Sequence, residues 1–422
     1  MRAIARKKIL LQVIFLNISP LSFRPTWTEI DLNAIIHNIR EFRRILPSGV
    51  KIMAVVKADA YGHGAVEVAR AMVRGGVDWF AVAFLEEGVE LRLAGIKTPI
   101  LLIGPTPPEQ VAAVIKYNLT QTIFSRETAA ALSLEAVKQR VKKPVHVKID
   151  TGMGRVGIAP QDTLEFIKEI SSYPGITVEG LLTHLASADE EDLSYTYQQI
   201  KLFNETIRSC RESGIEIPLI HAANSAGAIN VMESHYNLVR LGLSIYGHYP
   251  PGKAIADHIS LQPALSFKTQ IVYLKEVPAG ASVSYGGTFV TERESLIATV
   301  PVGYADGYNR LLSNRGRVLV KGTRVPVVGR VCMDYAMVDV TGVDGVRIGD
   351  EVVLYGRQGE EEVTVEEVAT QLDTIPYELL CAVHKRVSRF YMEEDRVVSF
   401  RNLLGRNYLA DGPTKKSADM DY

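Results

Sequence analysis

The chain has few cysteines and almost no net charge, and both features narrow the class of protein. Its three cysteines, Cys210, Cys332 and Cys381, lie far apart in 422 residues and form no Cys-x-x-Cys pair. This spacing argues against a disulfide framework or a zinc site and favours a reducing compartment, so we expect a cytoplasmic protein. With 47 basic and 48 acidic residues the formal net charge is −1, which gives no overall field to attract nucleic acid. We therefore expect small molecules, or copies of the chain itself, as partners.

Long apolar runs are also missing. The first residues read MRAIARKKILLQVIFLNISPLSF, where basic residues precede an apolar stretch as in a signal peptide. Gln12 and Asn17 interrupt that stretch, and no Ala-x-Ala cleavage site follows it. The stretch is too short to span a bilayer, and no other segment approaches the required length. We therefore expect no membrane partner, and we predict that 1–25 is a disordered N-terminal extension.

The rest of the sequence has the composition of a folded protein, 47% hydrophobic and 23% charged. The spacing of apolar residues predicts a helix over 32–47. Apolar runs of strand length follow, most of them separated by helix-like segments: 51–57, 78–84, 99–104, 120–124, 144–150, 178–185, 218–224 and 238–247. Eight runs are the number that a closed parallel barrel requires. A doubly wound sheet is the alternative, but no Gly-x-Gly-x-x-Gly follows the first run. We predict a (β/α)8 TIM-type barrel over 26–255.

The sequence pattern changes near residue 255. Short alternating strands with Pro-Ala-Gly and Gly-Gly turns replace the strand–helix rhythm, which indicates a separate C-terminal all-β domain over 256–402. The last residues, 403–422, are polar and predict a disordered tail.

Chemistry-bearing residues gather at the predicted strand ends, where a βα barrel carries its active site. The apolar run IMAVV ends on Lys57, which is a costly position for a lysine whose amine has no role. Further polar residues follow the later runs: Lys148, Asp150, His184, His221, Asn224, Ser225 and Arg240. Each alone is more often a structural residue than a catalytic one. Their convergence at one end of the barrel predicts an active site.

Nine short motifs, in this order, identify a family. They are AVVKADAYGHG, IDTGMGRVG, LLTHLASADE, HAANSAGA, VRLGLSIYG, VSYGGTF, GYADGY, GRVCMDYAMVDV and IPYELLC. Together they closely resemble alanine racemase, a family of pyridoxal 5'-phosphate (PLP) enzymes with an N-terminal barrel and a C-terminal β domain. The resemblance runs from Thr26 to Asn402, and Asp59, where the family often has Asn, is a small departure that touches no assigned role.

The resemblance implies that Lys57 forms a Schiff base with PLP, for which an amine is the chemically suitable group. It places Arg240 against the pyridine nitrogen. An arginine keeps its proton and cannot fully protonate that nitrogen, which disfavours transamination and suits a racemase. The other implied cofactor-binding residues, several of them at the phosphate, are Tyr61, His184, Asn224, Ser225, Gly242, Leu243 and Tyr377.

The same resemblance implies two bases, because racemisation moves a proton on both faces of the α-carbon. Lys57 would serve one face and Tyr285 the other. The residues that match the supporting family positions are His184 and Arg155 beside the tyrosine, His221 toward Arg240, and Lys148, which is carbamylated in some members. Arg155 and the backbone amide of Met333 would hold the substrate carboxylate.

The family also implies a homodimer whose active sites are shared, with Tyr285 and Met333 reaching the cofactor of the partner subunit. Tyr304 and Asp334 would line a narrow entrance that suits a small substrate such as alanine. The expected function is the interconversion of L- and D-alanine, with D-alanine supplied for peptidoglycan synthesis. Three alternatives remain open: a serine or broad-specificity racemase, a decarboxylase of the same architecture, and a single-domain PLP-binding barrel without turnover. A decarboxylase would have an acidic residue in place of Arg240, and the single-domain barrel would lack Tyr285.

Overall fold

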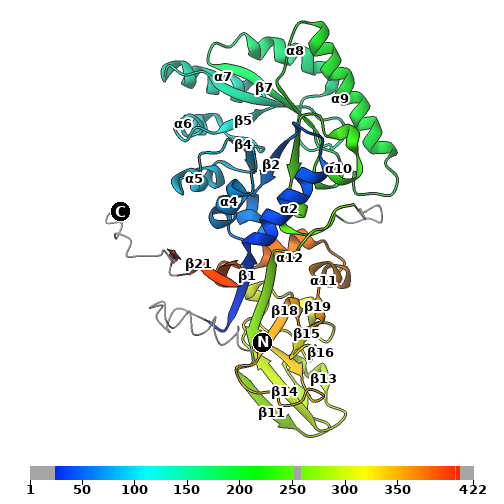
Figure 1. Cartoon of the computed structure of the whole chain (residues 1–422). Coiled ribbons are helices and arrows are strands. Elements are labelled where there is room, and N and C mark those ends of the chain that lie inside the picture. The colour runs from blue at the N-terminus through cyan, green and yellow to red at the C-terminus, as the bar shows by residue number, and fades with distance from the viewer. Residues whose placement is uncertain (1–23, 251–257, 404, 409–422) are drawn as a thin grey trace. The chain divides into compact units, whose positions relative to one another are not determined.

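The computed structural model describes residues 24–250, 258–403 and 405–408, and these form two compact units (Figure 1). The barrel unit comprises Ala34–Pro263. The β unit combines the N-terminal residues up to Asn33 with the residues from Ala264 onward. Each unit has its own sheets.

Eight parallel strands form the nearly closed sheet of the barrel unit, in the order β8-β7-β6-β5-β4-β3-β2-β9. At the junction of the two terminal strands, the amide of Arg240 donates to the carbonyl of Ala223 at 3.0 Å. The strands are β2 Lys51–Val55, β3 Trp79–Val82, β4 Ile100–Leu102, β5 Thr120–Ile123, β6 Lys143–Lys148, β7 Ile176–Leu182, β8 Leu219–His221 and β9 Leu238–Leu241. Each falls at one of the eight predicted runs, so the barrel prediction is confirmed.

Helices surround this sheet and connect its strands (Figure 1). The first, α2 Leu32–Ile45, confirms the helix predicted over 32–47. The others are α3 Lys57–Tyr61, α4 Ala65–Arg74, α5 Leu85–Leu93, α6 Val111–Lys116, α7 Arg126–Lys138, α8 Pro160–Ser171, α9 Ser194–Glu212 and α10 Ser225–Asn230, with short 3-10 turns η2 Pro108–Gln110, η3 Met232–Ser234 and η4 Leu243–Tyr246. Within the described parts of the chain, no helix is both long and apolar enough to cross a membrane.

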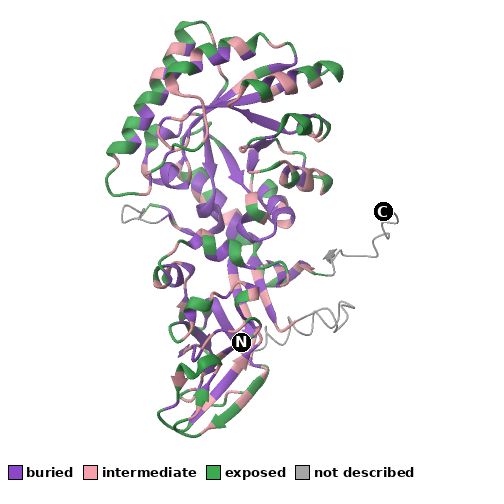
Figure 2. Ribbon diagram, turned by 180° about the vertical axis from the view of Figure 1, so that it is seen from behind, coloured by how far each residue is buried: buried purple, intermediate pink, exposed green. Residues whose placement is uncertain are grey.

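Burial explains why the barrel runs were readable from sequence. Every residue of β3, β4, β5 and β9 is buried, because side chains inside the barrel and side chains under the helices are both shielded from water. Figure 2 shows the barrel strands in purple and the outer faces of the helices in green. Such strands read as continuous apolar runs rather than as alternating patterns.

The β unit contains a nine-stranded sheet, a three-stranded sheet and a two-stranded ribbon among the described residues. In the large sheet the path is β16-β15-β18-β10-β1-β20-β21-β22, and β19 pairs with β18. Its strands are β1 Thr26–Asp31, β10 Leu265–Gln270, β15 Arg317–Val320, β16 Thr323–Pro326, β18 Glu351–Gln358, β19 Glu361–Val363, β20 Ser388–Glu393, β21 Arg396–Asn402 and β22 Gly405–Tyr408. The smaller sheets and the remaining elements are β11 Tyr273–Val277, β14 Ser295–Val300, β17 Ala336–Asp339, β12 Ser282–Val283, β13 Phe289–Val290, α11 Val365–Gln371, α12 Pro376–Ala382, η5 Tyr285–Gly287, η6 Tyr304–Asp306 and η7 Arg310–Leu312.

The domain limits differ from the predicted ones at three places. Strand β1 pairs with β10 and β20, so Thr26–Asp31 belongs to the β unit although it directly precedes the first barrel helix. The boundary between the units lies at 263/264 rather than 255/256. In the predicted tail, Gly405–Tyr408 pairs with β21 and extends the sheet. The remainder of that tail, and residues 1–23 of the predicted extension, lie outside the described residues.

Candidate active site

Lys57 stands at the carboxyl end of β2, where the chain turns in an unusual way. The four residues that follow it, Ala58, Asp59, Ala60 and Tyr61, have φ between 51° and 55°, in the left-handed region. A left-handed turn costs L-residues about 1–2 kcal/mol each. Strain of this kind persists where the surrounding structure fixes the backbone, and it often occurs at functional sites.

Two carboxylates stabilise this left-handed turn. Glu87 Oε1 accepts a hydrogen bond from the amide of Ala58 at 2.6 Å, and its Oε2 accepts from Ala83 and Phe84 at 2.7 and 3.1 Å. Asp59 Oδ1 accepts from the amide of Ala65 at 2.8 Å, at the start of α4. The backbone that carries Lys57 is therefore tied to the starts of α4 and α5, which limits the positions that its amine can reach.

A small cradle lies where α10 and η4 begin. Ser225 Oγ accepts hydrogen bonds from the amides of Gly242 and Ser244, at 2.9 and 3.4 Å. Because its oxygen accepts both, its hydroxyl proton remains available as a donor. A Cβ added at Gly242 would come within 2.7 Å of Tyr61 Oη, so the glycine leaves room beside two hydroxyls. Asn224 caps α10 by accepting from the amide of Gly227 at 2.9 Å, and Leu243, which begins η4, is buried.

Arg240, on β9, is buried and holds a fixed orientation. Its two terminal nitrogens donate to the carbonyls of Thr183, His221 and Ala222, at 2.8 to 3.1 Å, and to Nδ1 of both His221 and His184, at 3.0 and 3.2 Å. These five acceptors engage all four terminal N–H bonds, and no described residue accepts from Nε. The Nε–H is thus the donor that the guanidinium can offer to a ligand.

Positive charge gathers around this arginine. Burial, followed by the charges of Arg240 and Arg155, lowers the pKa of Lys148 to about 8. Burial and then the charge of Arg240 hold the pKa of His184 well below its usual range, and Lys57 is among the groups that lower it further. Since His184 Nδ1 accepts from Arg240, its proton sits on Nε2. Arg155 itself is exposed.

The other predicted residues lie in the β unit, where three of them share one region. The amide of Tyr304 donates to the carbonyl of Cys332 at 3.1 Å, one residue before Met333. Ser284 Oγ donates to the carbonyl of Arg330 at 2.7 Å, which ties the backbone before Tyr285 to the same segment. The side chains of Tyr285 and Met333 are largely exposed, at 71% and 53%. Tyr377, on α12, is half-buried.

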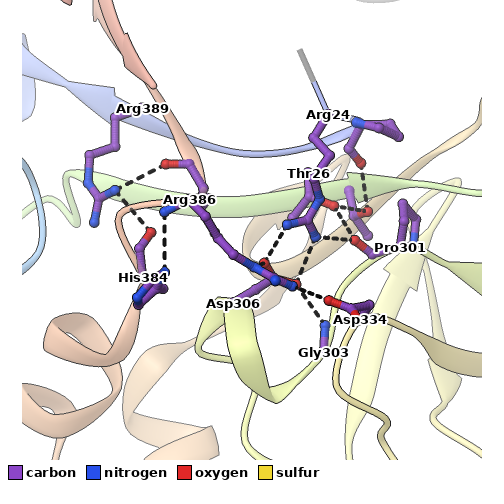
Figure 3. A network of polar contacts seen from close by, with 12 residues as sticks. Arg24, Thr26, Pro301, Gly303, Asp306, Asp334, His384, Arg386 and Arg389 are labelled. Atoms are coloured by element: carbon purple, nitrogen blue, oxygen red, sulfur yellow. Dashed lines mark hydrogen bonds and ion pairs between the residues drawn. The ribbon is translucent and has the colours of Figure 1, made fainter. Parts of the chain in front are cut away.

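A buried carboxylate organises this region (Figure 3). Asp306 accepts from both terminal nitrogens of Arg24 at 2.6 and 2.8 Å, from Arg386 Nε at 2.6 Å and from the amide of Gly303 at 3.0 Å. Arg386 also pairs with Asp334 at 2.5 Å. The network therefore links the turn that carries Tyr304 to the segment that carries Asp334.

Replacing Asp306 with Asn is expected to lower the unfolding free energy by about 2 kcal/mol at pH 7, because two arginines lose their buried partner. Burial alone would raise the pKa of Asp306, but the hydrogen bonds from Arg24 and Arg386 outweigh it and leave that pKa below its ordinary value. The carboxylate thus stabilises the fold above about pH 4 and loses this effect as the pH falls further. Urea unfolding from pH 7 to pH 3 measures this difference, which should shrink below about pH 4.

The control for that experiment is Asp344→Asn, at an exposed aspartate of the same unit. Its unfolding curve should match that of the unsubstituted protein at each pH. A constant difference between Asp306→Asn and the control over the whole range would contradict an ionic role for Asp306.

Sequence reasoning missed several residues of the site. Glu87 occupies the third position of α5, where glutamate often caps a helix, but its bond to Ala58 spans 29 residues and has no local signature. The Arg24, Asp306 and Arg386 network joins positions more than 280 residues apart in one case, so no spacing could reveal it.

Comparison with known proteins agrees with this geometry. The family model "Alanine racemase, N-terminal domain" matches residues 30–250, and "Alanine racemase, C-terminal domain" matches 264–391. An alanine racemase of Halothermothrix orenii is 49% identical over 368 residues, which cover 87% of this chain and 97% of that protein.

Solved structures give the same result. The alanine racemase of Clostridium difficile 630 superposes with a TM-score of 0.86 at 41% identity, covering 90% of this chain and 99% of the other. An alanine racemase of Bacillus anthracis with bound L-Ala-P has a TM-score of 0.85 at 38% identity, covering 90% and 98%. The chain therefore belongs to the alanine racemase family and is an isomerase that racemises alanine.

Proposed function

We propose that the protein interconverts L- and D-alanine with PLP as its cofactor, using Lys57 and Tyr285 as the two bases. The observation that carries this proposal is the arrangement of Arg240. All of its terminal N–H bonds are engaged by the protein, while its Nε–H has no acceptor among the described residues. A fixed cation with one outward donor suits a ring nitrogen that must be hydrogen-bonded without being fully protonated.

The residues of the barrel unit fit PLP. Ser225 and Tyr61 offer hydroxyls beside Gly242, where the missing side chain leaves the room that a phosphate needs. Leu243 and Asn224 would flank that phosphate, and Tyr377 would add a further hydroxyl. When bound, PLP withdraws electrons from the α-carbon of an amino acid and makes the α-hydrogen acidic.

The protein's own groups would then move the proton. The Lys57 amine exchanges a proton with the α-carbon from one face, and the Tyr285 hydroxyl exchanges one from the other. A tyrosine has an ordinary pKa near 10, so it needs a cationic surrounding to act as a base. The positive charges of Arg155 and Arg240 supply it, and the Nε2–H of His184 is a donor suited to a phenolate oxygen.

Substrate binding would use the same excess of positive charge. Arg155 and the amide of Met333 would hold the alanine carboxylate. Because the pKa of Lys148 is lowered to about 8, part of its amine is neutral near pH 7 and can react with carbon dioxide. We propose that Lys148 is carbamylated, since a carbamate would place a negative charge among these cations and orient Arg155.

A homodimer with shared active sites is the proposed assembly. Tyr285 and Met333 expose 71% and 53% of their surface in a single chain, and Tyr304 exposes 42%. Exposed large side chains of this kind suit residues that complete the site of a partner subunit. Asp334 and Tyr377 would line the entrance with Tyr304.

We propose that the reaction takes place in the cytoplasm and that its product D-alanine supplies peptidoglycan synthesis. The alanine racemase of Bacillus anthracis is described with bound L-Ala-P, which supports alanine as the preferred substrate. Serine is the second candidate, because it adds one hydroxyl to the same skeleton and a site selects weakly against such a change.

One experiment tests the cofactor, its attachment and the reaction together. The absorption spectrum of the purified protein is recorded before and after borohydride, and intact mass then reports whether cofactor is fixed to the chain. A chiral assay follows the turnover of both enantiomers of alanine, serine and lysine. We expect a coloured protein, a covalent adduct on Lys57, and fastest turnover of alanine. A colourless protein that stays inert toward D-alanine in the presence of PLP would overturn the proposal.

A further inference from the structure

Three buried side chains, Arg240, His221 and His146, follow one another inside the barrel, and the partly exposed Glu179 lies at the far end. Arg240 Nη1 lies 3.0 Å from Nδ1 of His221, and Nε2 of His221 lies 2.9 Å from Nδ1 of His146. Nε2 of His146 lies 3.5 Å from Oε2 of Glu179, close enough for an ion pair, and neither atom makes a hydrogen bond to any described residue. We call Arg240, His221, His146 and Glu179 the histidine chain.

The location of His146 shows that the two histidines of the histidine chain lie inside the barrel. His146 is on β6, yet its ring contacts His221 on β8 and Trp79 on β3, at centroid distances of 5.1 and 5.3 Å. Strands β3, β6 and β8 are not neighbours in the sheet, so side chains from all three can meet only inside the barrel. Both histidines are completely buried.

The hydrogen bonds of the histidine chain run in one direction. An arginine only donates, so Nδ1 of His221 must accept and its proton must sit on Nε2. That proton points to Nδ1 of His146, which in turn must accept, so the proton of His146 sits on Nε2 and faces Glu179. The Glu179 carboxylate, 3.5 Å from Nε2 of His146, can only accept, so its charge favours the same direction. Burial, with the nearby Arg240 charge, lowers the pKa of both histidines, in agreement with two neutral rings.

The backbone is adapted to this arrangement. The pairing of β6 with β7 shifts register after Val145, so that His146 faces Gly180 and Glu179 is the extra residue of a β-bulge. A Cβ on Gly180 would lie 2.4 Å from Nδ1 of His146, so only glycine leaves space for the ring. Lys143 is buried at the start of β6, and the negative charge of Glu179 favours the protonated form of its amine.

We propose that His146 and Glu179 are positioning residues that, through His221, fix the orientation of Arg240 and keep the full set of arginine protons in place. The inference rests on the proposed function only for the role given to Arg240 at the cofactor. Without the Glu179 carboxylate, the Nε2–H of His146 would face no acceptor. The two rings could not reverse their donors in response, because a proton on Nδ1 of His221 would then point at Arg240, which only donates.

The test uses holoenzyme labelled with 15N-histidine. Long-range proton–nitrogen spectra distinguish a protonated ring nitrogen from an unprotonated one, and a His146→Asn variant identifies the signals of that ring by their loss. We expect unprotonated Nδ1 atoms in His146 and His221. In Glu179→Ala the His146 signals should change, and kcat for alanine should fall about tenfold with little change in KM, because outer partners of a catalytic group are typically worth this much.

Two further variants separate positioning from folding. Glu179→Gln keeps an acceptor oxygen and should recover most of the lost kcat, while Glu216→Ala, at an exposed glutamate just before β8, should behave like the unsubstituted protein. A protonated Nδ1 on either ring, or a Glu179→Ala variant with unchanged spectra and kcat, would overturn the inference. The spectra do not depend on turnover, so a colourless protein with both Nδ1 atoms unprotonated would contradict the proposed function and leave the proton arrangement standing.

Discussion

Lys57→Ala is expected to lower the rate of alanine racemisation by about four orders of magnitude or more, the largest effect of any single change in this chain. The substitution removes the amine that would attach the cofactor and also one of the two proposed bases. Residues that act as one unit give losses of this size when a single member is removed. Initial rates with L-alanine and with D-alanine measure it, and intact mass after borohydride should show no cofactor fixed to the chain.

The substitution should leave the fold intact, because Lys57 is only half-buried and the left-handed turn after it is held by Glu87 and Asp59. Circular dichroism and the urea midpoint check this. Lys51→Ala, at the exposed start of the same strand, is the matched control and should racemise alanine normally. If Lys57→Ala retained a borohydride adduct, another lysine would hold the cofactor and the assignment of Lys57 would be wrong.

The barrel could be predicted from sequence because its signal is local. Each strand is an apolar run between helical segments. Strands such as β3 are fully buried, so polar residues do not alternate with the apolar ones and the run is easy to recognise. Strand β1 lacks such a signal. Its partners β10 and β20 lie more than 230 residues away, so neither the pairing nor its membership of the β unit could be derived from spacing.

The candidate site likewise has some features that the sequence could predict and others that it could not. Lys57 and Arg240 were predicted because chemistry-bearing residues at strand ends are conspicuous. The left-handed turn from Ala58 to Tyr61 could not be predicted, because alanine, aspartate and tyrosine have no strong preference for positive φ. The link between His146 and Glu179 depends on a β-bulge, and strands shielded on both faces lack the polar alternation from which a one-residue register shift could be recognised.

Tyr285→Phe is expected to slow racemisation by about a thousandfold, because it removes the base proposed for one face of the α-carbon. L- and D-alanine have equal free energies in water, so the equilibrium constant is one and kcat/KM must fall equally in both directions. The two directions should nevertheless differ in isotope exchange. With Lys57 intact, one enantiomer should still exchange its α-hydrogen with deuterated water without inverting, while the other should not.

That asymmetry distinguishes a lost base from a damaged site, since a general loss of binding would slow exchange of both enantiomers together. Mass spectrometry of alanine recovered from deuterated water, after chiral separation, measures it. Tyr285 exposes 71% of its surface in the single chain, so the hydroxyl can be removed without disturbing a core. Tyr273→Phe, at a comparably exposed tyrosine of β11, should exchange and invert both enantiomers like the unsubstituted protein. Equal exchange of both enantiomers by Tyr285→Phe would mean that a different group serves the second face.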